Sequence, residues 1–296
     1  MTVYEGIAEP ININGERATF INESYGHHER NRFDIWLAKS DKPTPLVIYI
    51  HGGGFVGGDK SKYYLSHDWP RFLENGISIA TINYRFMNEA PYGILSCMND
   101  AKRCVQYLRF QAEKFNIDKT RIACTGGSAG AGTALWLAFS DDMADNTNAD
   151  PVLRESTRLT CAGAFATQAT YDIFQWDKIL GIPLSQSPDR LLAIARVFGY
   201  KSAENRDLKK ETQIRDDLDF LAKMDKNDAP FFIFNKHKGG IPENHDDINH
   251  HPLHAKALKE KADSVGLQAI VYAPEIGIID PSEIDLVDFF MEKFAV

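Results

Sequence analysis

Short apolar runs recur along this chain, and segments with helical periodicity separate them. LVIYI, ISIATIN, RIACTG, TCAGAF, FFIFN and AIVYA are rich in β-branched and aromatic residues, as strands buried on both faces are. Apolar residues three and four positions apart predict a helix over 94–115, and a last helix is expected at about 282–294. This alternation predicts an α/β fold, with a mostly parallel central sheet and helices on both faces.

Size and charge exclude several classes of protein. The chain has 296 residues and a net charge of −8, so it offers no basic stripe for a nucleic acid. Its apolar runs are too short to cross a membrane. The start, MTVYEGIAEP, lacks the basic and apolar regions of a signal peptide. We therefore expect a cytoplasmic protein with a small-molecule partner, and neither a nucleic acid nor a membrane as partner.

More than sixty residues separate TCAGAF from FFIFN, which is too long for a simple crossover. This stretch is rich in charge and carries scattered helical patterns. We expect one domain over 1–296, with a helical lid or cap inserted after the sixth strand at about 172–228. The alternative is a peripheral helical layer without a functional part.

A serine stands between glycines where one strand passes into a helix. The segment IACTGGSAGAG contains G-x-S-x-G, with Gly126 and Gly130 flanking Ser128. The motif alone is weak, but a sharp strand-to-helix turn strains the serine backbone and requires small neighbours. The hydroxyl then projects from the end of the sheet, beside a helix N-terminus that favours developing negative charge. Ser128 is thus a candidate nucleophile.

A second glycine motif, HGGGFVGGD, directly follows LVIYI. Consecutive glycines leave backbone N–H groups free to stabilise the oxyanion of an acyl-transfer intermediate. A phosphate-binding loop is disfavoured because neither GK[ST] nor GxGxxG is present. A plain tight turn is the remaining alternative.

Together these motifs resemble the α/β-hydrolase esterases of the hormone-sensitive-lipase and xylan-esterase-like groups. Three further stretches support the resemblance: YGHHERNRFDIW, NYRFMNEAPY and HHPLHAKALKEKADSVG. It implies an α/β-hydrolase fold and a serine carboxylesterase that hydrolyses short-chain esters without a cofactor.

The resemblance also implies residue roles. Ser128 matches the nucleophile, and the backbone N–H groups of Gly53, Gly54 and Ala129 match the oxyanion hole. His51 would hold the glycine loop. The acid should lie about eleven residues before a helix leucine, which selects Asp247 ahead of Leu258, with Asp246 one residue away.

The catalytic base is missing from its usual place. The chain after the last strand reads AIVYAPEIGIIDPSEIDLVDFF and contains no histidine. One explanation is a relocated base, because HDDINHHPLH follows the neighbouring strand and carries several histidines. A histidine at a helix N-terminus tends to be neutral and able to accept a proton. We favour His251, then His250, then His245.

The second explanation is loss of catalysis with retention of binding. Plant gibberellin receptors resemble the same family but carry an apolar residue in place of the base, and Ile278 and Ile279 lie near that place here. Glu275 or Asp280 could also substitute, as poorer bases. The histidine-rich run could bind zinc, but Pro252 interrupts any clean His-x3-His face, so no metal is expected.

Overall fold

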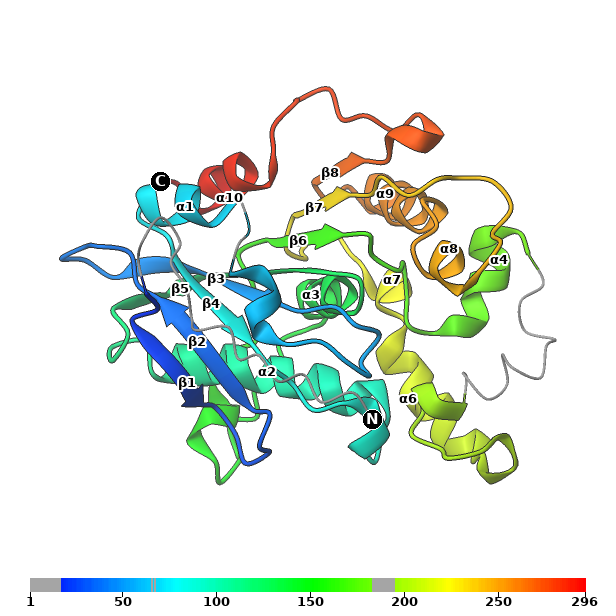
Figure 1. Ribbon diagram of the computed structural model, residues 1–296, viewed down its shortest axis with the longest axis horizontal. Helices are drawn as coiled ribbons and strands as arrows, with labels where there is room; N and C mark the ends of the chain where they lie inside the picture. Colours follow the sequence, from blue (N-terminus) through cyan, green and yellow to red (C-terminus); the bar gives the residue numbers. More distant parts are fainter. Residues whose placement is uncertain (1–16, 65, 67, 183–194) are drawn as a thin grey trace.

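A computed structural model describes residues 17–64, 66, 68–182 and 195–296, and a single eight-stranded sheet organises it (Figure 1). The strands are β1 (Phe20–Ser24), β2 (Arg32–Trp36), β3 (Thr44–Ile50), β4 (Ser78–Ile82), β5 (Ile117–Gly127), β6 (Ala162–Phe165), β7 (Phe231–Phe234) and β8 (Ala269–Tyr272). Their order across the sheet is β1-β2-β4-β3-β5-β6-β7-β8. The β1–β2 and β2–β4 pairs are antiparallel and the other pairs are parallel. The prediction of a mostly parallel sheet is confirmed.

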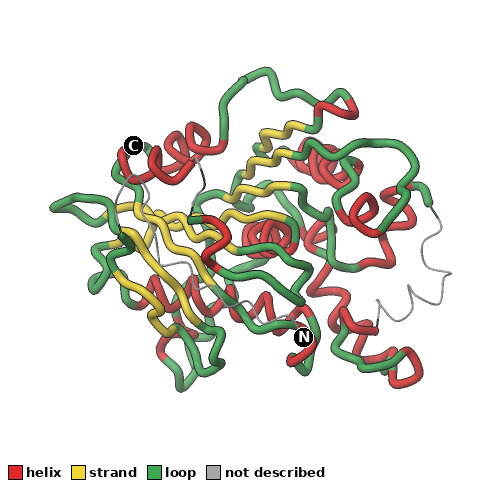
Figure 2. The backbone as a smooth tube through the Cα atoms, viewed as in Figure 1, coloured by secondary structure: helices red, strands yellow, loops and turns green. Residues whose placement is uncertain are grey.

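Helices lie on both faces of the sheet (Figure 2). The α-helices are α1 (Asp68–Glu74), α2 (Ile94–Phe110), α3 (Ala129–Phe139), α4 (Trp176–Leu180), α6 (Leu208–Leu218), α7 (Phe220–Lys223), α8 (His245–Asn249), α9 (Leu253–Val265) and α10 (Leu286–Phe294). The helix expected over 94–115 ends at Phe110, and the last helix begins at Leu286. Its start is set by Asp285, whose carboxylate accepts a hydrogen bond from the Asp288 N–H and so caps the first turn.

Strand β3 illustrates why a continuous apolar run is needed at the centre of the sheet. All seven of its residues are buried. Leu46, Ile48 and Ile50 belong to the core under α2, α3 and α9, whereas Val47 and Tyr49 belong to the core under α1 and α10. Since successive side chains point to opposite faces, each of these two cores takes alternate residues of the same strand.

The described part of the expected insertion, 172–228, is helical but discontinuous. It holds α4, α6, α7 and two single 3₁₀ turns, Ile173–Gln175 and Ala203–Asn205. Residues 183–194, which belong to the predicted lid, lie outside the described part. Among the described residues, no helix combines the length and hydropathy that a membrane span requires.

Helix α3 approaches the sheet so closely that only glycine fits at the contact. A Cβ atom on Gly130 would lie 1.9 Å from the Ile50 carbonyl oxygen, and one on Gly126 would lie 2.3 Å from the same atom. Backbone atoms cannot yield as a flexible side chain can. These two glycines therefore bring the start of α3 against the end of β3.

We predict that Gly130→Ala lowers the free energy of unfolding by about 2 kcal/mol or more, because the added methyl group overpacks a backbone contact. Gly57→Ala is the control, since nothing lies within 4 Å of a Cβ at Gly57. Chemical denaturation followed by circular dichroism would measure both. Equal stability of the two variants would contradict the close approach.

Candidate active site

Ser128 lies on a strained turn between β5 and α3. Its φ and ψ are 52° and −118°, a left-handed backbone that is costly for a residue with a side chain. The Ser128 N–H donates to the Phe165 carbonyl at 2.9 Å, and its carbonyl accepts from the Gly132 N–H at 3.1 Å. The turn expected from G-x-S-x-G is thus present, held on both sides by backbone hydrogen bonds.

A histidine lies against the Ser128 hydroxyl, and it is His250. Its Nε2 is 2.7 Å from Ser128 Oγ, which is hydrogen-bonding distance. The two residues are 122 positions apart, and His250 immediately follows α8 in the segment after β7. The histidine therefore comes from the relocated run rather than from the loop after β8.

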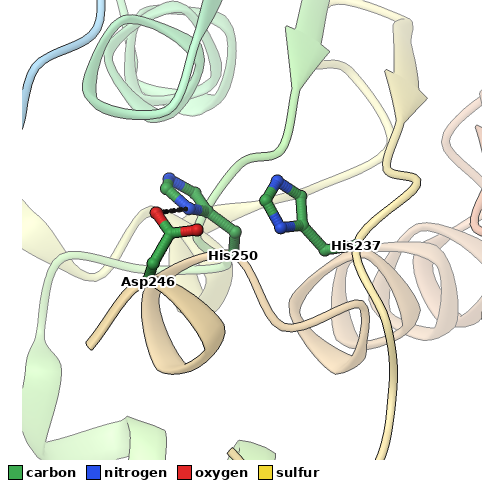
Figure 3. Close-up of side chains that lie close together, drawn as sticks. All are labelled: His237, Asp246 and His250. Carbon is green, nitrogen blue, oxygen red and sulfur yellow. Dashed lines mark ion pairs between the residues drawn. The ribbon is translucent and has the colours of Figure 1, made fainter. Parts of the chain in front are cut away.

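The carboxylate beside His250 belongs to Asp246. Its Oδ1 is 2.9 Å from His250 Nδ1 (Figure 3), and Asp246 lies on α8 four positions before His250, the residue that directly follows this helix. Nδ1 nevertheless has no aligned hydrogen bond among the described residues, so the carboxylate lies beside the N–H direction rather than along it. The Asp246 side chain is 67% exposed, whereas that of His250 is only 14% exposed.

The choice of His251 and Asp247 from sequence is corrected by this geometry. His251 Nε2 donates to the Gly240 carbonyl at 3.0 Å, and its Nδ1 accepts from the Leu253 N–H. The Asp247 carboxylate accepts hydrogen bonds from the Glu243 N–H and from the Asn244 side chain. It therefore stabilises the turn that leads into α8.

Both pairs, Asp246–His250 and Asp247–His251, have the same i,i+4 spacing, so spacing alone does not separate them. The helical turn His245–Asn249, which no local pattern predicted, decides which pair faces Ser128. His245, the third candidate, lines the same pocket as Ser128.

Three buried polar side chains hold the short helix α8 in place. Asn235, at the end of β7, donates its side-chain N–H to the His250 carbonyl at 3.0 Å. Gln168 donates to the Asn249 carbonyl at 2.7 Å, and His254 Nε2 donates to the Ile248 carbonyl at 3.1 Å. Buried side chains thus fix the carbonyls of Ile248, Asn249 and His250, and with them the position of His250. No sequence motif predicted these anchors.

The pKa of His250 is lowered from its usual 6.5, chiefly by burial and also by the neighbouring His237. The nearby Asp246 carboxylate opposes this shift. A lowered pKa leaves the imidazole neutral at neutral pH, and a neutral Nε2 can accept a proton from Ser128.

His51 organises the glycine loop. Its Nδ1 donates to the Gly52 carbonyl at 2.7 Å, and its ring stacks on Tyr84 with centroids 4.2 Å apart. Burial lowers the pKa of His51 to about 4, so the ring is neutral. A Cβ atom on Gly58 would lie 2.6 Å from His51 Nδ1, which shows how tightly the loop closes around the ring.

The predicted oxyanion donors lie on the glycine loop and at the start of α3. Gly54 and Ala129 line the same pocket as Ser128. Gly53 has a φ of 111°, and its carbonyl accepts from Val56 and Gly57, so it turns the loop. Within the described chain, the N–H groups of Gly53, Gly54 and Ala129 donate to no backbone carbonyl.

Ser128 opens into a pocket of about 450 Å³. Most of its wall is apolar, including Phe55, Ile94 and Tyr171. The segment 172–228 contributes Ile173, Trp176, Arg196 and Val197, and Gln168 and Asn249 add polar groups beside Ser128. An apolar pocket with a few polar groups near a nucleophile is the usual form of a small-molecule site.

The loop after β8 forms a short bridge of its own. Ala273 and Ile278 exchange backbone hydrogen bonds, and Glu275 and Ile279 are exposed. This loop lies beside the loop after β7, since a Cβ on Gly239 would come 2.9 Å from Ile276. The two loops are neighbours, as the hypothesis of a relocated base requires.

The fold and the strained serine turn identify the α/β-hydrolase class. The BD-FAE family model matches residues 33–243, and the chain therefore belongs to the BD-FAE family. A truncated carbohydrate esterase from gut microbiota has the same fold, with a TM-score of 0.69, 18% identity, and coverage of 94% of this chain and 96% of that one.

Two curated relatives are esterases. A probable isoprenylcysteine alpha-carbonyl methylesterase of Arabidopsis thaliana is 30% identical over 142 residues, which is 46% of this chain and 28% of the relative. An ethyl acetate hydrolase of Pseudomonas putida is 33% identical over 95 residues, 31% of this chain and 28% of the relative. The alignments thus span little more than a quarter of each relative's own length.

We predict that a fluorophosphonate probe labels Ser128 at a rate that depends on His250 and not on His251. His250→Gln should slow labelling by about 100-fold or more, the typical contribution of a general base. His251→Gln is the matched control, because its ring contacts Gly240 and Leu253 instead. Labelling followed by mass spectrometry measures both rates, and equal slowing in the two variants would contradict the assignment.

Proposed function

We propose that this protein is a serine carboxylesterase that hydrolyses short-chain carboxylic esters through an acyl-enzyme. The observation that carries the proposal is the 2.7 Å contact between Ser128 Oγ and His250 Nε2 at the strained turn. A serine hydroxyl is a weak nucleophile until an adjacent base takes its proton. Here a neutral histidine occupies that position.

In the proposed reaction, Ser128 Oγ attacks the ester carbonyl while its proton passes to His250 Nε2. The carbonyl oxygen becomes an oxyanion, which the N–H groups of Gly54 and Ala129, with Gly53, stabilise. The intermediate collapses and the alcohol leaves with the proton from His250. Water, activated by the same imidazole, then releases the carboxylic acid and restores Ser128.

Asp246 is proposed as the acid that stabilises the protonated His250. Its carboxylate is close to Nδ1 but exposed and poorly aligned, so its contribution is expected to be smaller than that of a buried carboxylate.

The size of the substrate is inferred from the pocket. Bulky side chains such as Tyr171, Ile173 and Trp176 surround the volume of about 450 Å³ that Ser128 lines. A pocket this small suits short acyl groups, and a similarity to an ethyl acetate hydrolase is consistent with that. The part of 172–228 that lines the pocket supports a lid or cap that shapes the entrance.

The rival function is ligand binding without catalysis on the same fold. It was suggested by the absence of a histidine after β8. The place of His250 beside Ser128 favours the enzyme, because a binding protein would not need a neutral imidazole at hydrogen-bonding distance from this hydroxyl.

We predict that the wild type hydrolyses p-nitrophenyl acetate and butyrate, and that Ser128→Ala lowers kcat by more than about 10⁴-fold because the nucleophile is removed. p-Nitrophenyl octanoate, tested as a third substrate, should be hydrolysed more slowly than the acetate and the butyrate, because its acyl chain is longer. Release of p-nitrophenol measures all rates. Binding of these esters without turnover by the wild type would favour the rival function.

A second prediction concerns the acid. Asp246→Asn should lower kcat by about 10- to 100-fold, less than the roughly 10⁴-fold effect of a buried acid in this role. Asp247→Asn is the matched control one residue away, and it should change kcat by no more than about threefold, because its side chain contacts Glu243 and Asn244 rather than His250. Steady-state kinetics on p-nitrophenyl acetate would separate them, and a larger loss in Asp247→Asn would reassign the acid.

A further inference from the structure

A third side chain that the proposed reaction does not use lies beside the base. His237, on the loop after β7, has its ring centroid 4.9 Å from that of His250 (Figure 3). His237, Asp246 and His250 each offer one ligand atom, and these atoms all lie within 4.8 Å of one another. No metal is expected from the run 245–254, where Pro252 interrupts the spacing, but this cluster draws its second histidine from an earlier segment.

We propose that His237, Asp246 and His250 form an inhibitory site for a zinc ion. Two imidazoles and one carboxylate are a ligand set that suits zinc, with water as the fourth ligand. Imidazole also favours late first-row metals over magnesium and calcium, which prefer oxygen ligands. The effect on activity rests on the proposed function, but binding of the ion does not.

The cluster can close around an ion with small side-chain rotations. Ligand atoms on a tetrahedral zinc with bonds of about 2.1 Å are about 3.4 Å apart. Asp246 is largely exposed and His237 is half-buried, so both can move. Lys236 and Lys238 flank His237, but both are exposed and solvent screens their charge.

The ligand atom on His250 is Nδ1, because Nε2 contacts Ser128. Nδ1 is buried and makes no well-aligned hydrogen bond with the described residues. A metal ion that binds Nδ1 therefore breaks no hydrogen bond of good geometry. A neutral imidazole carries one proton. When a metal ion occupies Nδ1, that proton must be on Nε2, which then donates to Ser128 Oγ and cannot accept its proton.

Zinc would therefore switch off the base without filling the pocket. His237 and His250 do not line the pocket that opens from Ser128. The inhibition should appear as a fall in kcat with little change in KM, because ester binding is not blocked. Removing the ion with a chelator should restore activity.

The test compares His237→Gln with His27→Gln, an exposed histidine far along the chain. Each protein is treated with a chelator, dialysed and titrated with free Zn²⁺, and its inhibition is expressed relative to its own metal-free activity on p-nitrophenyl acetate. His237→Gln should raise the inhibition constant by at least about tenfold, since even an outer-shell partner is worth 10- to 100-fold in metal affinity. His27→Gln should behave as the wild type, and Mg²⁺ should not inhibit.

Titration calorimetry of Zn²⁺ into Ser128→Ala, alone and combined with His237→Gln, separates the two proposals. Zinc binding that disappears with His237→Gln supports the site even if no ester is hydrolysed. Equal zinc binding in the two proteins, or equal inhibition of His237→Gln and His27→Gln, overturns the site and leaves the esterase proposal standing.

Discussion

The contact between Ser128 Oγ and His250 Nε2 joins two parts of the fold that are separately held in place. On one side, the strained serine backbone is kept by hydrogen bonds to Phe165 and Gly132, and by the close approach of Gly130 to β3. On the other, α8 is anchored by Asn235 and by other buried side chains. Because the contact is short, a small shift on either side would break it, and the chemistry proposed for this site depends on both anchors.

A single helical turn supplies both the imidazole and its carboxylate. Asp246 lies on α8 and His250 directly follows it, four residues further on, so this turn sets the distance between the two side chains. The arrangement also has a cost. The turn lies at the surface, and the Asp246 carboxylate is largely exposed. The same exposure leaves Asp246 free to move, and with His237 it provides the metal ligands proposed above.

Burial acts on the two histidines of the site in the same direction but with different consequences. It lowers the pKa of His51 and of His250, so both rings are neutral. His51 donates its Nδ1 N–H to the Gly52 carbonyl and so shapes the loop that carries Gly53 and Gly54, while its Nε2 lies beside the Arg30 side chain. His250 directs Nε2 at a hydroxyl. What each ring does is decided by what its nitrogens contact.

The sequence by itself determined the sheet, the serine turn and the glycine loop. These depend on local signals: continuous apolar runs, G-x-S-x-G after a strand, and HGGG after another. It also restricted the candidate base to a few histidines after β7, because none follows His254. It could not choose among them, since Asp246–His250 and Asp247–His251 share one spacing. Only the tertiary structure decided, because the rotation of α8 about its axis is set by buried contacts with Gln168 and Asn235, which lie in the segments that follow β6 and β7.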